Sequence, residues 1–279
     1  MEVAPDVQLI EIPDPRIARL YAVNVYLIGR EEAILIDSGD GRDESNSAIL
    51  EAINRFRDRR LSYVVITHGH NDHFGGIPAI KAATGAKIAA HRANLAEIEE
   101  ELGSAVVDIP LQGGENLKVA GVELTVVHTP GHSAGDISLF DPTRKVVFTG
   151  DTVLGVGTVV IGLHASDTMS QYMHSLRRLQ ALGAGVLCPG HGPVVQNAHT
   201  RIQEVFDHRL MREDQIVAAL GQGIKTSKEL VAKIYVDVDP RLHGMAESNV
   251  LAHLLKLENE GRVREQKEGE NTIYVLAGQ

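Results

Sequence analysis

The feature that most constrains this chain is the stretch THGHNDHFGG at residues 67–76. It places His68, His70, Asp72 and His73 within six positions, directly after the apolar run LSYVVI. Imidazole nitrogens and carboxylate oxygens are the groups with which proteins bind zinc and similar divalent ions. A single histidine is more often a surface or hydrogen-bonded residue. Four such groups at the end of one predicted strand instead indicate a metal site.

Three further polar residues follow apolar segments later in the chain. His132 lies in HTPGHSAGD, Asp151 in FTGD and His191 in PGHGP, and each comes directly after a glycine. Each alone is weak evidence, because a histidine in a tight loop can also cap a turn. Since all of them follow predicted strands, we expect loops at strand ends to bring them together with the first cluster.

Apolar segments with the composition of β-strands alternate with helical patterns over the first two thirds of the chain. The predicted strands cover residues 21–29, 32–39, 61–68, 86–91, 115–119, 122–129, 137–141, 145–151 and 185–193, the last including a loop. The predicted helices cover about 44–59, 75–85 and 167–182, the last with Asp167 as N-cap. This alternation predicts an α/β layered fold in which strands face each other and helices cover the outside.

The pattern changes near residue 196, where one long helical segment begins and runs to Gly221 or Gly223. Thr226 and Glu229, in TSKE, form a predicted capping box at the start of the next helix. A third helix, GMAESNVLAHLLKLENEG, ends at Gly261, and RVREQKEGENTIYVLA predicts a β-hairpin. This order is typical of a winged helix. We therefore predict one domain at residues 1–199 and a second at 200–279.

Charge and cysteine content exclude several classes of protein. The 27 basic and 37 acidic residues leave a net charge of −10, which disfavours broad electrostatic binding to nucleic acid. Residues 200–279 carry 11 basic and 13 acidic side chains, so the predicted winged helix is not basic either. The single cysteine, Cys188, excludes an internal disulfide. With no signal peptide or long apolar run, we expect a soluble cytoplasmic protein that does not enter a membrane.

The segments THGHNDH, TPGHS, FTGD and PGHGP, in this order, resemble the motifs of the metallo-β-lactamase superfamily over about residues 7–195. The resemblance implies an αββα sandwich with a metal site at one edge. It implies a first metal bound by His68, His70 and His132, a second bound by Asp72, His73 and His191, and Asp151 as a bridge. Asp37, in LIDSGD, matches the family's aspartate that orients ligand histidines.

The second half of the chain resembles a narrower group. GDTVLGVGTVV, YMHSLRRL, PGHGPVVQNA, HRLMREDQI and HLLKLENEGRV are similar to segments of the animal lactamase-beta-like proteins and their bacterial relatives. These join the metal fold to a C-terminal winged helix, and the animal members are similar to single-strand RNA endonucleases. After GTVV this chain reads IGLHASDT, where bacterial relatives often have a proline-containing loop. His164 in this loop is either an exposed histidine or a proton donor to a leaving group.

The resemblance implies a hydrolase in which two divalent ions hold a bridging hydroxide as nucleophile. Zn²⁺ is the first candidate, and Mn²⁺ or Fe are alternatives. Asp72 would bind the second ion and also hold the hydrogen of the hydroxide. This chemistry suits phosphodiesters, thioesters, lactones and β-lactams alike, so the metal ligands alone do not indicate which substrate is hydrolysed.

Three functions therefore stay open. The first, which the sequence favours because of the whole-chain resemblance, is a phosphodiesterase that acts as an endoribonuclease on single-stranded RNA. The second is a hydrolase of small thioesters, lactones or β-lactams, which the acidic charge and scarce aromatic residues favour. A DNA-binding regulator is the third, and the charge of the winged helix speaks against it. For base stacking, only Phe74, Tyr172 and His164 are candidates near the cleft, and Phe74 could equally be a core residue. A homodimer is compatible with the sequence.

Overall fold

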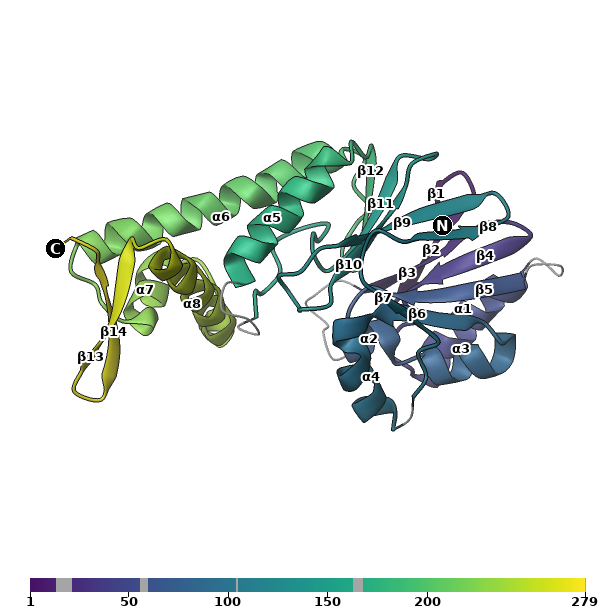
Figure 1. The fold of residues 1–279 in the computed structure, drawn as a ribbon, viewed down its shortest axis with the longest axis horizontal. Helices are drawn as coiled ribbons and strands as arrows, with labels where there is room; N and C mark the ends of the chain where they lie inside the picture. Colours follow the sequence, from purple (N-terminus) through teal and green to yellow (C-terminus); the bar gives the residue numbers. More distant parts are fainter. Residues whose placement is uncertain (14–21, 56–59, 104, 163–167, 279) are drawn as a thin grey trace.

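The computed structural model describes residues 1–13, 22–55, 60–103, 105–162 and 168–278. Two β-sheets pack face to face, helices cover their outer faces, and a smaller C-terminal unit of helices and a hairpin follows (Figure 1). The predicted αββα sandwich with a C-terminal winged helix is thus confirmed. The candidate site residue His164 and the predicted N-cap Asp167 lie outside the described residues.

Within the described residues, the first sheet has seven strands in the order β1-β2-β3-β4-β5-β6-β7. Their bounds are β1 Glu2–Ala4, β2 Val7–Ile12, β3 Val23–Ile28, β4 Glu32–Ile36, β5 Arg60–Ile66, β6 Lys87–His91 and β7 Ile109–Leu111. Strands β1 to β4 pair antiparallel, whereas β4 to β7 pair parallel. Because parallel strands end at the same edge, the residues that follow β4, β5 and β6 lie at one edge of the sheet.

The second sheet has five strands in the part of the chain that the structure describes, in the order β12-β11-β10-β9-β8. Their bounds are β8 Asn116–Val119, β9 Val122–His128, β10 Ile137–Asp141, β11 Val146–Gly150 and β12 Val186–Pro189. Only β11 and β12 pair parallel among these. Both sheets contain strands buried at every position, such as VNVYLI in β3, because helices cover the faces that do not pack on the other sheet.

Three hydrophobic cores correspond to the three interfaces of the sandwich. One lies between the first sheet and its helices, one between the sheets, and one between the second sheet and the helices α5 and α6. The helices on the first sheet are α1 Asp43–Asn54, α2 Asn71–Phe74, α3 Ile77–Thr84 and α4 Leu95–Leu102, with the short 3₁₀ turn Arg92–Asn94 before α4. Helix α5, Thr168–Ala181, covers the second sheet. The predicted helix over 44–59 is shorter, because α1 ends at Asn54.

The C-terminal unit follows the predicted order of helices and hairpin. Helix α6, Ala198–Gly221, runs from the sandwich to this unit (Figure 1). Its remaining elements are α7 Ser227–Ile234, the 3₁₀ turn Pro240–Leu242, α8 His243–Asn259, β13 Val263–Glu268 and β14 Asn271–Leu276. The capping box is present, since the side chains of Thr226 and Glu229 each bond to the other residue's backbone N–H.

Helix α6 belongs to both parts of the molecule. Ile202 and Val205 in its first half pack in the core beside α5, whereas Ile216 and Leu220 pack in the core of the C-terminal unit. The boundary between residues 199 and 200 therefore stays a prediction, because the helix crosses it. None of the helices in the described part of the chain has the length and apolar character that crossing a membrane requires.

Candidate metal centre

The seven residues predicted to bind metal come together at one edge of the sandwich. They lie in the segments that follow strands β5, β9, β11 and β12. In the described part of the chain, three overlapping groups have ligand atoms within 4.8 Å of one another. These groups are His68, His70 and His132; Asp72, His73 and His191; and His68, His73 and Asp151.

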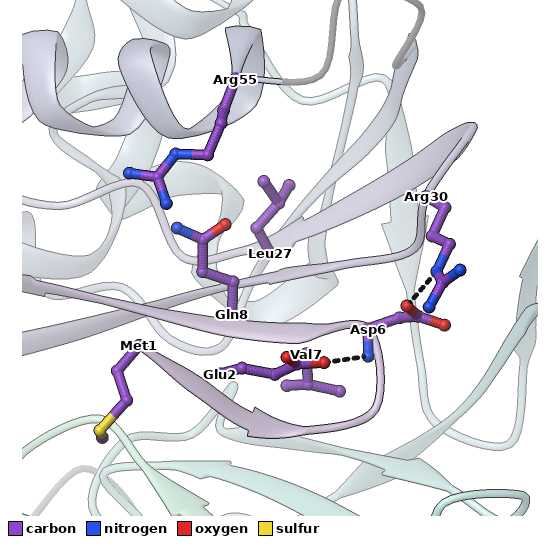
Figure 2. Close-up of a pocket in the computed structure, with 8 residues that line it drawn as sticks. All are labelled: Met1, Glu2, Asp6, Val7, Gln8, Leu27, Arg30 and Arg55. Carbon is purple, nitrogen blue, oxygen red and sulfur yellow. Dashed lines mark hydrogen bonds and ion pairs between the residues drawn. The ribbon is translucent and has the colours of Figure 1, made fainter.

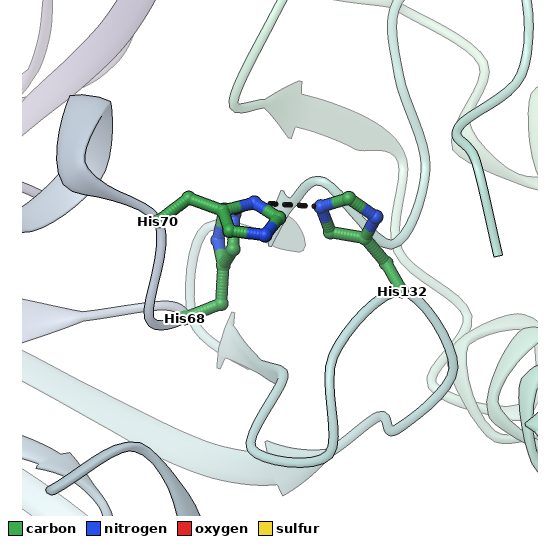
Figure 3. A group of neighbouring side chains, drawn as sticks. All are labelled: His68, His70 and His132. Atoms are coloured by element: carbon green, nitrogen blue, oxygen red, sulfur yellow. Dashed lines mark hydrogen bonds between the residues drawn. The ribbon is translucent and has the colours of Figure 1, made fainter. Parts of the chain in front are cut away.

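The first group brings three imidazole rings to one point (Figure 3). His70 Nδ1 lies 3.0 Å from His68 Nε2 and 3.0 Å from His132 Nε2. A ring nitrogen carries either one hydrogen or one lone pair, so His70 Nδ1 can form a good hydrogen bond with only one of them. Three converging ring nitrogens suit a cation that all three bind.

Asp37 fixes the orientation of two predicted ligands, His73 directly and His68 through Thr67. Its Oδ2 accepts hydrogen bonds from His73 Nδ1 at 2.8 Å and from Thr67 Oγ1 at 2.9 Å, and its Oδ1 accepts from the Thr67 N–H at 2.8 Å. Because Thr67 uses its hydroxyl hydrogen on Asp37, its oxygen accepts from His68 Nδ1 at 3.1 Å. Both histidines therefore carry a hydrogen on Nδ1 and turn Nε2 toward the centre, the orientation that metal binding requires.

The second group faces the first across Asp151. His191 Nε2 lies 3.4 Å from Asp72 Oδ2 and 3.4 Å from His73 Nε2. Asp151 Oδ2 lies 3.8 Å from His132 Nε2 and 3.5 Å from His191 Nε2, so one carboxylate reaches both groups. Its Oδ1 is buried without a hydrogen-bond partner among the described residues. Its closest cationic neighbour among these residues is His73 Nε2 at 3.6 Å, which is too far for a hydrogen bond. A buried carboxylate oxygen without a hydrogen bond is costly, and a bound cation would remove that cost.

Burial and charge keep most of these groups in the protonation state that metal binding needs. Burial lowers the pKa of His68 well below its usual value, and burial together with the neighbouring imidazoles lowers that of His70 to about 4. Both rings are therefore neutral at pH 7. Burial alone would raise the pKa of Asp72, but the hydrogen bond from His191 and the charge of His73 hold it below the usual range. Its carboxylate is ionised at neutral pH.

His73 shows the opposite electrostatic balance. Burial lowers its pKa, but the carboxylates of Asp37 and Asp151 outweigh burial and raise the pKa to about 10. The surrounding carboxylates thus favour a positive charge at this point. A bound divalent cation would supply that charge, so the residues present fit a metal centre.

Glycines allow the segments that carry the predicted ligands to approach one another. A Cβ on Gly190 would lie 2.5 Å from Asp151 Oδ1 and 2.8 Å from His73 Cε1. A Cβ on Gly150, whose φ is +47°, would lie 2.6 Å from Thr67 Oγ1. Any larger residue would push these segments apart, which explains why a glycine precedes Asp151 and His191.

The segment that carries His191 is held by strand β3. Asn24 Nδ2 donates to the carbonyls of Pro189 and Gly192 at 3.0 and 2.8 Å, and Tyr26 Oη donates to Pro189 O at 2.9 Å. Sequence reasoning did not identify Asn24 or Tyr26 as part of the site. The one available signal is the asparagine itself, a polar residue within an otherwise apolar strand that is buried at every position.

His132 is oriented by a different contact. Its Nδ1 lies 2.8 Å from the carbonyl oxygen of Val160, and a carbonyl can only accept, so Nδ1 carries the hydrogen. Its Nε2 is then free to face His70 and Asp151. The next residue, Ser133, donates its backbone N–H and its hydroxyl to Asp136, which anchors the turn.

Two of the three rings considered for base stacking are buried. Phe74 and Tyr172 are both 0% exposed, so the prediction that Tyr172 offers a ring at the cleft is wrong, and of the two alternatives for Phe74 the core position is the correct one. Phe74 packs in the core beneath the first sheet, and the hydroxyl of Tyr172 donates to Thr152 O. The third candidate, His164, lies outside the described residues.

A separate pocket of about 490 Å³ lies at the N-terminal hairpin (Figure 2). None of the seven predicted ligands is among the residues that line it, which are Met1, Glu2, Asp6, Val7, Gln8, Leu27, Arg30 and Arg55. Asp6 and Arg30 form an ion pair at its rim (Figure 2). We assign no role in the metal site to this pocket.

The family follows from comparison with known proteins. Residues 18–191 match the family described as the metallo-beta-lactamase superfamily, and residues 226–271 match the beta-lactamase associated winged helix domain. The chain belongs to the metallo-β-lactamase superfamily. The protein is accordingly a metal-dependent hydrolase, as predicted, whereas the identity of its metal is not shown by this membership.

Curated relatives cover most of the chain. It is 34% identical over 240 residues to an Aspergillus fumigatus protein named atrochrysone carboxyl ACP thioesterase, covering 81% of this chain and 71% of the relative. It is 29% identical to the beta-lactamase-like protein 2 homolog of Drosophila melanogaster, covering 94% of this chain and 91% of the relative. Relatives thus include proteins named for different activities.

Solved structures confirm the fold over nearly the whole chain. A metallo-beta-lactamase family protein from Thermus thermophilus is 25% identical, with a TM-score of 0.78 over 99% of this chain and 100% of that one. A beta-lactamase domain protein from Burkholderia ambifaria is 20% identical, with a TM-score of 0.83 over 99% of this chain and 93% of that one. Because its sequence identity is only 20%, the Burkholderia ambifaria structure supports a shared fold and says nothing about a shared activity.

Proposed function

We propose that this protein uses two divalent metal ions to hydrolyse a small ester-like substrate, with a thioester as the first candidate. The main support for a two-metal site is the position of Asp151. Its Oδ2 lies 3.8 Å from His132 Nε2 in the first group and 3.5 Å from His191 Nε2 in the second. Zn²⁺ is the first candidate for both ions, with Mn²⁺ or Fe as alternatives, because His and Asp ligands accept all three.

Each of the seven residues has a role in this proposal. His68, His70 and His132 hold one ion, Asp72, His73 and His191 hold the other, and Asp151 lies between them. Bound there, the ions would supply an activated water and polarise the scissile carbonyl. The ionised carboxylate of Asp72 can take the hydrogen of the attacking water. A role for His164 as proton donor to the leaving group stays a prediction, because its position is not described.

Two observations favour a small substrate over RNA. Phe74 and Tyr172, two of the three rings considered for base stacking, are buried. The chain carries a net charge of −10, which opposes the approach of a polyanion. The relative at 34% identity is named as a thioesterase, which makes a thioester the first member of the substrate class to test.

Endonucleolytic cleavage of single-stranded RNA is the second candidate. The sequence motifs resemble those of animal proteins that are similar to single-strand RNA endonucleases. The matched winged helix at residues 226–271 also favours this candidate, because such folds commonly contact nucleic acid. A DNA-binding regulator has less support, since the C-terminal unit is slightly acidic. A cytoplasmic location and a homodimer stay predictions.

A panel of substrates tests the proposal. The purified protein, loaded with Zn²⁺ or Mn²⁺, is incubated with an acyl-N-acetylcysteamine thioester, a lactone, a chromogenic β-lactam and an unstructured RNA oligonucleotide. We expect turnover of the thioester that a chelator abolishes and that Asp72→Ala lacks. Internal cuts in the RNA, without thioester turnover, would contradict the first candidate and support the second.

A further inference from the structure

The segment that orients His132 also contacts the C-terminal half of the molecule. We call residues 159–161 the bridging segment. Its first carbonyl accepts from Arg209 Nη2 at 2.6 Å, and its last N–H donates to Asn249 Oδ1 at 3.0 Å. Its middle carbonyl accepts from His132 Nδ1 at 2.8 Å. Three consecutive residues therefore connect one predicted metal ligand to side chains on helices α6 and α8.

Arg209 is buried and contacts both the bridging segment and Asn249. Its side chain is 1% exposed although it carries a full charge, and its Nη1 lies 3.2 Å from Asn249 Oδ1. The centre of its guanidinium group lies 5.2 Å from the centre of the Tyr172 ring. Burying a guanidinium is costly, so a chain keeps one there only where several contacts hold it. Arg209 thus fixes Asn249 and the bridging segment together.

Tyr172 links Arg209 to the backbone next to Asp151, which is a second part of the metal centre. Its hydroxyl donates to Thr152 O at 2.8 Å, directly after Asp151. A Cβ on Gly131 would lie 2.6 Å from the Tyr172 side chain, directly before His132. The ring beneath Arg209 therefore packs against the residues beside two predicted ligands.

The position of the middle carbonyl determines which way the His132 ring points. That carbonyl keeps the hydrogen on Nδ1 and leaves the lone pair of Nε2 facing His70. The residues on either side of it are anchored by Arg209 and Asn249. If those anchors are lost, the carbonyl can move while His132 stays connected to the rest of its own loop.

We propose that Arg209 and Asn249 are positioning residues that hold the bridging segment and thereby orient His132 toward the metal centre. The inference rests on the proposed metal function. It means that the C-terminal unit completes the first metal group, whether or not it also contacts a substrate. The charged group and the amide act through a backbone carbonyl, and neither touches the reacting atoms.

Two variants of Asn249 separate positioning from packing. Asn249→Leu has a similar volume but lacks the acceptor for the bridging segment and for Arg209, whereas Asn249→Asp keeps an acceptor oxygen. Glu213→Gln is the matched control, because it disturbs the buried ion pairs of Glu213 with Lys256 and Arg262 without contacting the bridging segment. All are made in the full-length chain, and their melting temperatures are recorded.

The readouts are metal affinity by competition with a chromophoric chelator, the visible absorption spectrum of the Co²⁺-loaded protein, and kcat and KM separately. We expect Asn249→Leu to bind one of two ions about 10-fold more weakly, which is the lower end of the cost of losing a hydrogen-bond partner of a metal ligand. Its Co²⁺ spectrum should change, and kcat should fall more than KM rises. Asn249→Asp should restore the wild-type spectrum, and Glu213→Gln should lower only the melting temperature.

The outcomes distinguish this inference from the function on which it rests. Wild-type protein that binds no divalent ion would overturn both. Two ions bound with equal affinity and equal spectra by wild type and Asn249→Leu would overturn the inference alone, as would an equal change in Glu213→Gln. If Asn249→Leu does not fold, Arg209→Lys takes its place under the same criteria, because it keeps the charge but cannot contact Asn249 and the bridging segment together.

Discussion

Different parts of the chain orient different histidines of the predicted metal centre. On one side, Asp37 orients His73 and, through Thr67, also His68, and all of these residues belong to the sandwich. On the other side, His132 depends on a carbonyl whose neighbours bond to the C-terminal helices. We call these the Asp37 side and the bridging side. The difference indicates that the sandwich alone supports only part of the centre.

The Asp37 side also carries a strained backbone. Asp37 has a φ of +61°, which is uncommon for a residue other than glycine. Three hydrogen bonds to its carboxylate and one from its own N–H to Val65 O hold it there. Strain of this kind persists where the surroundings over-determine the conformation. The bridging side shows no positive φ at residues 159–161, and its side-chain anchors come from helices α6 and α8.

The largest expected effect is the loss of a ligand itself. Asp72→Ala should reduce the bound metal from two ions to one and remove nearly all hydrolysis, a larger loss than the about 10–100-fold effect expected for residues that only orient a ligand. Metal content by mass spectrometry and turnover measure both. Asp43→Ala, an exposed carboxylate at the start of α1, is the control. Retention of two ions and full activity would refute the ligand assignment.

The next effect tests the Asp37 side. Asp37→Asn tolerates the positive φ but replaces one acceptor oxygen by a donor, so at least one of its three hydrogen bonds is lost. We expect metal affinity to fall by about 10–100-fold, at least as much as in Asn249→Leu on the bridging side. Chelator competition on both variants compares the two sides directly. A smaller loss in Asp37→Asn would show that the bridging side dominates.

A stability effect is expected where strand β3 holds the segment that carries His191. Asn24→Leu removes the side-chain donor to the carbonyl of Gly192, and an unsatisfied buried acceptor costs about 1–3 kcal/mol. Tyr26→Phe should cost less, because Asn24 still donates to Pro189 O. Denaturant unfolding of both variants measures the difference. Equal losses would mean that Asn24 does not hold this segment.

The smallest expected effect on the metal centre concerns Glu213 in the C-terminal unit, where we expect a change in stability alone. Burial raises its pKa, but contacts with His253 and Lys256 outweigh burial and lower the pKa to about 2 from 4.5. A carboxyl group with a depressed pKa stabilises the fold above its unfolded-state pKa. The contribution, up to about 3 kcal/mol, is therefore lost as the pH falls from about 4.5 to 2.

Comparison of wild type with Glu213→Gln tests this pH dependence. The difference in unfolding free energy between the two proteins should shrink over that pH range, because only the wild type loses an ionised group. Metal binding at pH 7 should stay equal in both. A difference that is constant from pH 5 to pH 2.5 would contradict the depressed pKa.

Local patterns in the sequence predicted the fold class and the seven candidate ligands, which the structure brings together. The motifs are short and follow apolar strands, and each lone ligand directly follows a glycine, so their convergence could be expected from the sequence. Their division between two metal ions was implied only by the resemblance to the metallo-β-lactamase superfamily. The capping box of Thr226 and the order of elements in the winged helix were also predictable from local patterns. The β1–β2 hairpin and helix α4 were not predicted, and the helix after β4 is shorter than its pattern indicated.

Only the tertiary structure decided what surrounds the ligands. Asn24 and Gly192 are 168 residues apart, and Ile161 and Asn249 are 88 apart, so no periodic pattern could pair them. The burial of Phe74 and Tyr172 likewise depends on helices packed from elsewhere in the chain, which is why the prediction of a stacking ring at Tyr172 was wrong. The sequence by itself determined which groups can bind metal, because that is a property of the side chains. Their orientation depends on long-range hydrogen bonds and packing, which exist only in the folded protein.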